Sequence, residues 1–383
     1  MRLRLSIRWQ YLGAAVSMLL GIRAAGAFTS GPAVPSRIRV GGEGAVEGWA
    51  ALAMEALWRD GAVVLSGLDE HGPGRGEVNG SVDFRDIASA LPASLFDGAG
   101  SGAPVLLSPG APVNGVHDEL EEAKSRGLYL PGSGLLPHTD GYVYGDDMPD
   151  FIFLLCEQAS PVGGWNALLD GDAFLAGLAA GSPEQRHLAD WLATTPVDLS
   201  ESSETGIAQG RCATGPVVQH VRTPSNRTRL KWRRQVNVRN VQGLDIWQPL
   251  SESGTSDMYS ACENSSVCRP TPETVSDRYL SLWRSLPSMD EASATETASR
   301  LREVDRLIQA ASSEAFANYS FALSRGEALV LDNYRMLHAR LPYWPGPGRR
   351  FWRVWSWTSD GTGLPPDGAQ TSNPINDKVF QGV

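Results

Sequence analysis

The pattern of apolar and polar positions predicts strands scattered along the chain with helices between them. Apolar residues recur at helical spacing over residues 45–60, 82–96, 172–180, 182–195, 271–286 and 297–314. Short apolar or alternating runs predict strands over 61–68, 151–158, 163–171 and 351–359, hairpin arms over 215–223 and 229–238, and a strand-turn-strand unit over 319–333. Residues 97–134 are rich in Gly, Pro and Ser and predict mostly loops. Because strands and helices do not alternate regularly, we expect an antiparallel or mixed sheet with flanking helices.

The first residues have the pattern of a targeting segment. Three arginines within the first eight positions precede an apolar run of twelve residues, and Ala25 and Ala27 then form a small-x-small cleavage pattern. We expect a signal peptide over residues 1–27, cut after Ala27, and no stable membrane insertion once it is removed, since the run is short for a bilayer. Residues 28–44 are rich in Ser, Pro and Arg, as in a linker or a transit-peptide-like segment. The protein is therefore expected to enter the secretory pathway, either to be secreted or lumenal or to reach a plastid through a bipartite presequence.

The composition is that of an ordinary globular protein, and the charge argues against nucleic acid as a partner. The 383 residues carry a formal net charge of −10, whereas a protein that binds nucleic acid through phosphate contacts needs a basic face. The one basic run, "RTRLKWRRQVNVR", alternates like a strand, and we expect it to form a solvated sheet face. Of the four cysteines, Cys156 lies in an apolar run and predicts a buried thiol, while Cys262 and Cys268 flank a polar loop and could form a disulfide.

The stretch "LPHTDGYVYG" supplies the first candidate chemistry. In extended chain, residues two apart face the same way, so His138 and Asp140 can present an imidazole and a carboxylate to one metal ion. His338, in "DNYRMLHAR", is the downstream histidine best suited to complete the set, since His187 lies in a polar helix and His220 ends a strand. Two histidines and one carboxylate, with open positions left on the metal, are the ligands of non-haem Fe(II) oxygenases.

Two arginines follow His338, and they support the hypothesis of an iron oxygenase. Arg349 and Arg353 lie eleven and fifteen residues further on. An iron oxygenase of this kind uses a co-substrate that chelates the metal and ends in a carboxylate, which a guanidinium can bind with two parallel hydrogen bonds.

With these motifs in order, the chain resembles the taurine dioxygenase / γ-butyrobetaine hydroxylase family (TauD/TfdA-like) of Fe(II)- and 2-oxoglutarate-dependent dioxygenases. The resemblance runs from about residue 45 to about residue 360 and rests on "GAVVLSGL", the HxD pair, "GGWNALLDG", "VRTPSNRTRLKWRRQVNV" and "FALSRGEALVLDNYRMLHAR". It implies an α+β fold with a double-stranded β-helix (jelly-roll) core and flanking helices. It also implies an oxidoreductase that uses Fe(II), 2-oxoglutarate and O2 on a small-molecule substrate and releases succinate and CO2.

The resemblance assigns roles to individual residues of this chain. It implies that His138, Asp140 and His338 are the catalytic iron ligands. It implies that Arg349 binds the distal carboxylate of 2-oxoglutarate and that Arg353 supports it. The adjacent Arg350 stays open as the alternative to Arg349.

Three departures from the family pattern shape further expectations. Asn166 stands where the family has a Ser or Thr that helps to hold 2-oxoglutarate, and it could still donate a hydrogen bond. The separation of His138 from His338 exceeds the family's by about fifty residues, so we expect one dioxygenase domain over 45–383 with an insertion around 250–300. The loop after the HxD pair is this protein's own. The substrate-contact candidates lie in that loop and are Tyr142, Tyr144, Asp146 and Asp147.

Tyrosines beside acids suit a cationic substrate such as an amine or an amino-acid derivative, and a solvated loop is the alternative interpretation. Because related halogenases lack the carboxylate ligand, Asp140 favours hydroxylation, with desaturation or cyclisation also open. A non-catalytic jelly-roll binding protein and a zinc hydrolase on the same three ligands are the competing hypotheses. Intact ligands argue against the first, and the arginines would have no purpose in the second.

Overall fold

A computed structural model of the chain describes residues 34–42, 48–75, 77–78, 81–96, 100–107, 135–141, 148–160, 164–198, 214–221, 227–232, 234–236, 279–281, 289–340 and 349–359. Residues 1–33 lie outside this part, as do Cys262, Cys268 and most of the predicted insertion at 250–300. Expectations about the targeting segment, the disulfide and the insertion therefore stay predictions. No helix in the part that the structure describes is both long enough and apolar enough to cross a membrane.

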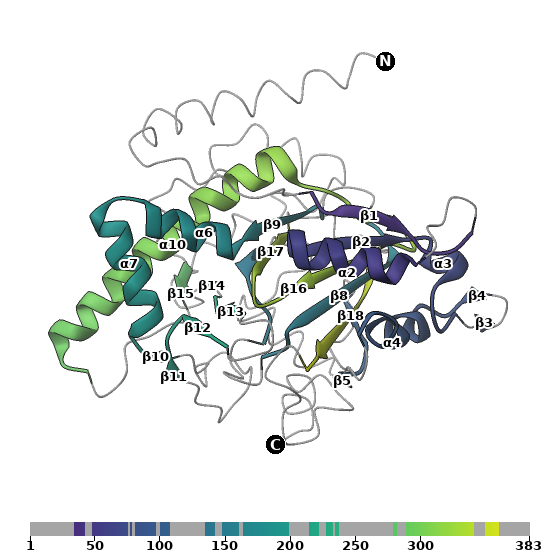
Figure 1. Cartoon of the computed structure of the whole chain (residues 1–383), viewed down its shortest axis with the longest axis horizontal. Coiled ribbons are helices and arrows are strands. Elements are labelled where there is room, and N and C mark those ends of the chain that lie inside the picture. The colour runs from purple at the N-terminus through teal and green to yellow at the C-terminus, as the bar shows by residue number, and fades with distance from the viewer. Residues whose placement is uncertain are drawn as a thin grey trace, which may run out of the picture.

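A seven-stranded sheet forms the centre of the molecule (Figure 1). Its strands are β1 Ser36–Arg39, β2 Ala62–Ser66, β16 Ala328–Asp332, β8 Phe151–Gln158, β18 Arg350–Trp357, β5 Gly100–Ser101 and β6 Val105–Leu107. The order is β1-β2-β16-β8-β18-β5, with β6 also paired to β18. Only the β1–β2 pair among them is parallel, so strands far apart in the sequence meet mainly as antiparallel neighbours.

A second, three-stranded sheet carries two of the candidate ligands. It has the order β7-β17-β9, with β7 Leu135–His138, β17 Met336–Arg340 and β9 Asn166–Asp170, and both pairings are antiparallel. Further short strands are β3 Glu77–Val78, β4 Ser81–Val82, β10 Val197–Asp198, β11 Thr214–Gly215, β12 Val218–His220, β13 Thr228–Leu230, β14 Arg234–Val236 and β15 Tyr279–Ser281.

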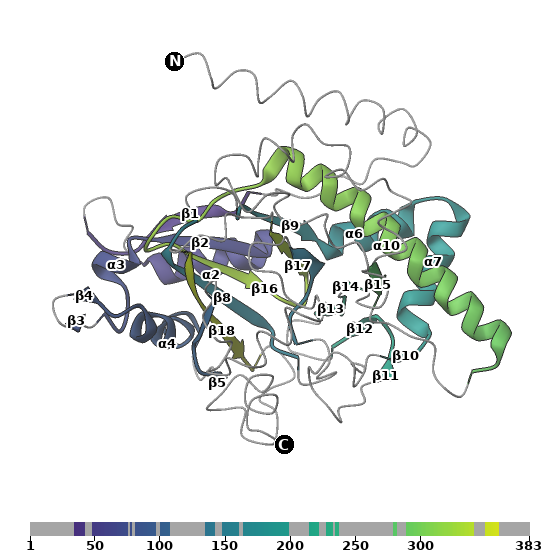
Figure 2. The same cartoon turned by 180° about the vertical axis from the view of Figure 1, so that it is seen from behind.

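Helices cover both ends of this arrangement. They are α2 Trp49–Asp60, α3 Leu68–His71, α4 Phe84–Leu95, α6 Gly171–Ala180, α7 Pro183–Thr194 and α10 Glu291–Tyr319. Figures 1 and 2 show α6, α7 and α10 gathered at one end of the molecule and α3 and α4 at the other. The start of α7 is fixed by Ser182, whose hydroxyl accepts a hydrogen bond from the N–H of Gln185 while the Gln185 side chain binds the Ser182 N–H. Such a capping box stabilises a helix start by about 1 kcal/mol.

The central sheet separates two hydrophobic cores. Val63 and Leu65 of β2 point to a core shared with α2 and α4, whereas Ala62 and Val64 point to the opposite core. That second core also holds Leu168 and Leu337 of the three-stranded sheet, residues of α6, α7 and α10, and Trp355. The space between the two sheets is therefore filled by apolar side chains, and strands paired on both sides are buried on both faces.

These features confirm the expected α+β fold with antiparallel sheets, consistent with a jelly-roll core. The described strands form separate sheets and do not close into a barrel. One helix prediction is wrong: within 271–286, Tyr279–Ser281 form β15, which pairs antiparallel with β14. The predicted hairpin is confirmed where β12 pairs with β13, but its second arm continues into a separate strand, β14.

Candidate metal centre

Adjacent strands bring the three candidate metal ligands together. His138 ends β7 and stands directly opposite His338 in the antiparallel β7–β17 register, with 4.1 Å between their ring centroids. Asp140 follows in the turn after β7. One ligand atom from each residue lies within 4.8 Å of the others, and all three residues are buried. Among the described residues this is the only such cluster of three or more metal-binding side chains.

The two oxygens of Asp140 have different neighbours. Oδ1 lies 3.4 Å from Nε2 of His138 and 3.9 Å from Nε2 of His338. Oδ2 accepts hydrogen bonds from Nη1 of Arg353 at 3.1 Å and from Nε1 of Trp355 at 2.9 Å. Burial alone would raise the pKa of Asp140, but Arg353 and the two histidines hold that pKa well below its usual range. The carboxylate is therefore ionised and available as a metal ligand at neutral pH.

Main-chain contacts fix the segment that carries these ligands. The Asn333 side chain accepts from the Asp140 N–H and donates to the Asp140 carbonyl, both at 2.9 Å. Thr139, between the two ligands, donates its N–H to the carbonyl of Trp232 at 2.8 Å, and its hydroxyl accepts from the Trp232 N–H at 3.0 Å. Each of these groups is buried, where an unpaired polar atom would cost about 1–3 kcal/mol. The turn that carries Asp140 is thus held by Trp232 and Asn333, which lie far from it in the sequence.

The two arginines left open by the sequence differ sharply in environment. Arg349 is buried at 5% exposure, and its guanidinium lies 4.0 Å from the ring centroid of Phe351. Arg350 points outward, with a side chain 45% exposed and its Nε 3.1 Å from a carboxylate oxygen of Glu157. Only Arg349 of the pair is therefore placed to act inside the protein. Arg353 contacts the candidate ligand Asp140 directly.

Asn166 shares a sheet face with the candidate ligand His338. In the β17–β9 register, Leu168 is opposite His338 and Asn166 is opposite Arg340, two residues along on each strand. Because residues two apart on a strand face the same way, Asn166 and His338 lie on one face. Asn166 is buried, and its side-chain Nδ2 has no hydrogen-bond partner. A buried amide donor without a partner therefore lies on the same sheet face as His338, and the role of Asn166 toward 2-oxoglutarate stays a prediction.

The substrate candidates Tyr142, Tyr144, Asp146 and Asp147 lie outside the described residues. Their role stays a prediction. Cys156 is a free, buried thiol, as predicted, and burial raises its pKa to about 12.

The expectation of a solvated face for the basic run is wrong in its described part. Arg227, Arg229 and Lys231, on alternate positions, are only 8%, 0% and 2% exposed. Alternation placed them on one face, but that face is buried.

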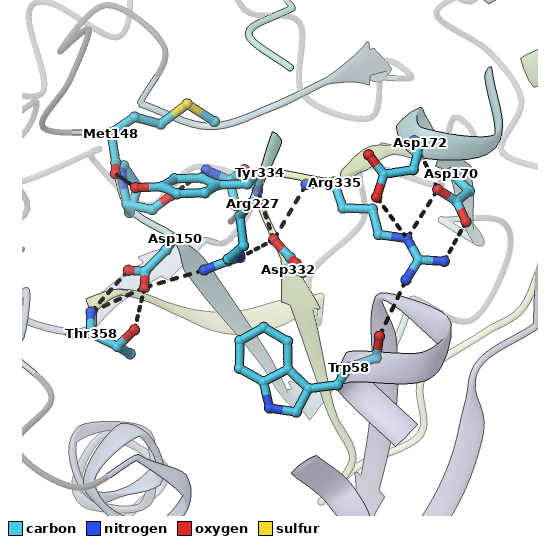
Figure 3. A network of polar contacts seen from close by, with 12 residues as sticks. Trp58, Met148, Asp150, Asp170, Asp172, Arg227, Asp332, Tyr334, Arg335 and Thr358 are labelled. Atoms are coloured by element: carbon cyan, nitrogen blue, oxygen red, sulfur yellow. Dashed lines mark hydrogen bonds and ion pairs between the residues drawn. The ribbon is translucent and has the colours of Figure 1, made fainter. Parts of the chain in front are cut away.

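Arg227 is the centre of a buried ion-pair network (Figure 3). Its Nη2 binds Asp332, and its Nη1 lies 3.6 Å from Asp150. The guanidinium also lies 4.5 Å from the ring centroid of Tyr334. Asp150 in turn accepts from the N–H and hydroxyl of Thr358. These contacts join the chain after the HxD loop to the turn before β17 and to the end of β18.

A second ion pair in Figure 3 anchors the same turn from the other side. Arg335 binds both carboxylate oxygens of Asp170, at 3.0 and 2.6 Å, and donates to the carbonyl of Arg59 at 3.1 Å. Asp170 is the N-cap of α6, and Arg59 is in the last turn of α2. The turn that leads to His338 is therefore fixed to two helices.

Sequence reasoning gave no role to Asn333 or Trp355. Asn333 was visible in the "DN" pair before His338, but its contact with Asp140 joins residues 193 apart. Trp355 is two residues after Arg353, so strand alternation could have placed both on one face. The register that brings that face to Asp140 was not readable from the sequence.

A comparison with protein families settles the family. The family described as "Taurine catabolism dioxygenase TauD, TfdA family" matches residues 47–355, a span that includes His138, Asp140 and His338. The chain belongs to this family. The resemblance seen in the sequence is thereby confirmed, and with it an oxidoreductase class. A search of curated protein sequences gives no match for this TauD-family chain.

Solved structures resemble the chain distantly. AAD-2 in complex with Mn(II) and N-oxalylglycine has a TM-score of 0.45 at 13% identity, over 87% of this chain and 97% of that one. A taurine dioxygenase from Burkholderia xenovorans has 0.43 at 14%, over 84% and 85%. An asparagine oxygenase in complex with Fe(II), 2S,3S-3-hydroxyasparagine and succinate has 0.40 at 16%, over 81% and 83%. At these scores the assignment rests on the family match and on the site itself.

Proposed function

We propose that this TauD-family protein is an Fe(II)- and 2-oxoglutarate-dependent dioxygenase that hydroxylates a small organic molecule. The observation that carries the proposal is the cluster of His138, Asp140 and His338, with Oδ1 of the carboxylate facing both Nε2 atoms. In the overall reaction, one oxygen atom of O2 enters succinate as 2-oxoglutarate loses CO2, and the other enters a C–H bond of the substrate.

The donor set fits Fe(II). Two imidazoles and one carboxylate suit a divalent transition metal and leave coordination positions for other ligands. When bound, the metal would supply the oxidising chemistry by activating O2 together with 2-oxoglutarate. The protein's part is to hold the ligands and exclude water, and the burial of all three residues supports this role.

Arg349 is the residue that we assign to the distal carboxylate of 2-oxoglutarate. Its burial suits this role, because a guanidinium binds a carboxylate most strongly where water is excluded. Asn166 would add a hydrogen bond from its spare Nδ2. Arg353 already donates to Asp140, and its Nε has no hydrogen-bond partner, so it can support a second carboxylate beside the metal.

The substrate class is a proposal from the sequence alone. Tyr142 and Tyr144 next to Asp146 and Asp147 suit an amine or an amino-acid derivative. The experiment is a screen of amino acids, betaines and other small amines for substrate-stimulated succinate release by the anaerobically iron-loaded protein, with products analysed by mass spectrometry. A gain of 16 mass units shows hydroxylation, whereas a loss of 2 shows desaturation or cyclisation.

Matched variants separate the proposal from its competitors. His338→Ala should abolish succinate release, and His187→Ala, on the exposed side of α7, should not change it. Activity that needs zinc but not 2-oxoglutarate would instead support a hydrolase. An iron stoichiometry near zero after reconstitution would support a non-catalytic binding protein.

A further inference from the structure

The carboxylate of Asp140 is held asymmetrically. Oδ1 faces the two histidines, while Oδ2 is occupied by two donors, the Trp355 indole N–H at 2.9 Å and the Arg353 guanidinium at 3.1 Å. A carboxylate oxygen that accepts two hydrogen bonds, one of them charge-assisted, is a poorer partner for a metal ion than one that accepts neither. The two oxygens are therefore not equivalent as ligands.

The main chain of Asp140 is held in place by Asn333. Asn333 is fully buried and binds both the N–H and the carbonyl of Asp140. Its Nδ2 also donates to the carbonyl of Pro149 at 2.7 Å, which fixes the amide itself. Asn333 thus fixes where the side chain of Asp140 begins, and the two donors at Oδ2 set how its carboxylate is turned.

Trp355 is equally fixed. It is 1% exposed, on a strand paired with β8 on one side and with β5 and β6 on the other. Its ring meets that of Trp357 edge to face, with 6.5 Å between centroids, and the Arg353 guanidinium lies 4.7 Å from its centroid. The indole N–H is therefore a donor at a set position that cannot follow the carboxylate if Asp140 rotates.

We propose that Trp355, with Arg353, is a positioning residue that makes Asp140 a ligand through Oδ1 alone. The inference rests on the proposed function, because it presumes that the triad binds a metal. Its consequence concerns coordination positions. With Asp140 bound through one oxygen, the protein would supply three ligand atoms and would leave more of the metal free for co-substrate and O2 than a carboxylate bound through both oxygens would.

The test is a titration with metal alone, so that 2-oxoglutarate plays no part. Trp355→Phe removes the indole donor and keeps an aromatic ring. Trp352→Phe is the matched control, because Trp352 lies on the same strand and donates its Nε1 to Glu157, a carboxylate outside the triad, at 2.8 Å. Affinity is measured for Fe(II) under anaerobic conditions. Co(II), whose visible absorption reports coordination number, gives an independent signature.

We expect Trp355→Phe to weaken metal binding by about tenfold or more and to change the Co(II) spectrum, as loss of a ligand-orienting contact generally does. Trp352→Phe should change neither. If Trp355→Phe does not fold, by near-ultraviolet circular dichroism, Arg353→Gln decides, because it removes the other Oδ2 donor from a less buried position.

The outcomes distinguish this inference from the proposed function. If the unaltered protein binds no metal, the proposed function fails. If it binds metal and the folded Trp355 and Arg353 variants match it in affinity and Co(II) spectrum, the metal centre stands and the positioning role is overturned. Equal weakening by the Trp352 variant would also overturn it, since the effect would then be unrelated to Asp140.

Discussion

His138 and His338 are direct partners across the antiparallel β7–β17 pair, although 200 residues of chain separate them. The pairing places both imidazoles on one face of the three-stranded sheet, and Asp140 follows within the next turn. The candidate metal centre therefore depends on the register of these two strands. A slip of one residue would turn His338 to the other face and separate the ligands.

Arg349 and Arg350 provide a paired test of co-substrate binding. Arg349→Gln should raise the KM for 2-oxoglutarate by roughly 10- to 100-fold, because it removes a buried charge-assisted contact to a carboxylate. Arg350→Gln should leave that KM unchanged, since Arg350 is exposed and pairs with Glu157. Steady-state succinate formation measures both. The reverse pattern would mean that Arg350 is the clamp.

Arg227 should contribute more to the free energy of unfolding than the expected solvated position of the basic run suggests. Arg227→Ala leaves Asp332 and Asp150 without a buried cation, and breaking such a pair costs roughly 3–5 kcal/mol. Arg306→Ala removes an exposed pair with Glu303 and should cost about 0.5 kcal/mol or less. Urea denaturation compares the two. Equal losses would show that the Arg227 network contributes no more than a surface pair.

Asp150 should give the fold a pH dependence. Burial, which outweighs the hydrogen bonds from Thr358 and the charge of Arg227, raises its pKa from 3.8 to about 7. Because the folded state then binds the proton more tightly than the unfolded state, this contribution to stability is complete below about pH 4 and is lost as the pH rises through 7.

The measurement is the free energy of unfolding at pH 5.5 and at pH 7.5. Asp150 should account for a decrease of up to about 2 kcal/mol between them. Asp150→Asn, which cannot titrate, should remove that part of the decrease. An identical decrease in the variant would show that Asp150 is ionised throughout the range.

Local pattern predicted much of the fold and picked out the three residues that the structure brings together at the candidate metal centre. The spacing of apolar residues located α2, α4, α7 and α10, and the strands at β2, β8, β9 and β18. It failed at Tyr279–Ser281, where an apparent helical period gave way to pairing with β14. A short strand takes its stability from a partner distant in sequence, and helical propensity is only a weak prior against it.

The sequence could not show which part of the protein packs against each side chain. Alternation showed that Arg227, Arg229 and Lys231 share a face, but not that the face is buried. It placed Arg353 and Trp355 together, but not against Asp140. Such contacts follow from register and packing, so the candidate ligands could be picked out from the sequence while the residues that hold them in place could not.

The most direct test of the metal centre needs no knowledge of the substrate. Under anaerobic conditions, addition of 2-oxoglutarate to the Fe(II)-loaded protein should produce the visible charge-transfer absorption of an iron chelate, saturating at one equivalent of iron. His338→Ala should abolish it, and His187→Ala should retain it in full. No absorption in the unaltered protein, or full absorption in the His338 variant, would contradict the account.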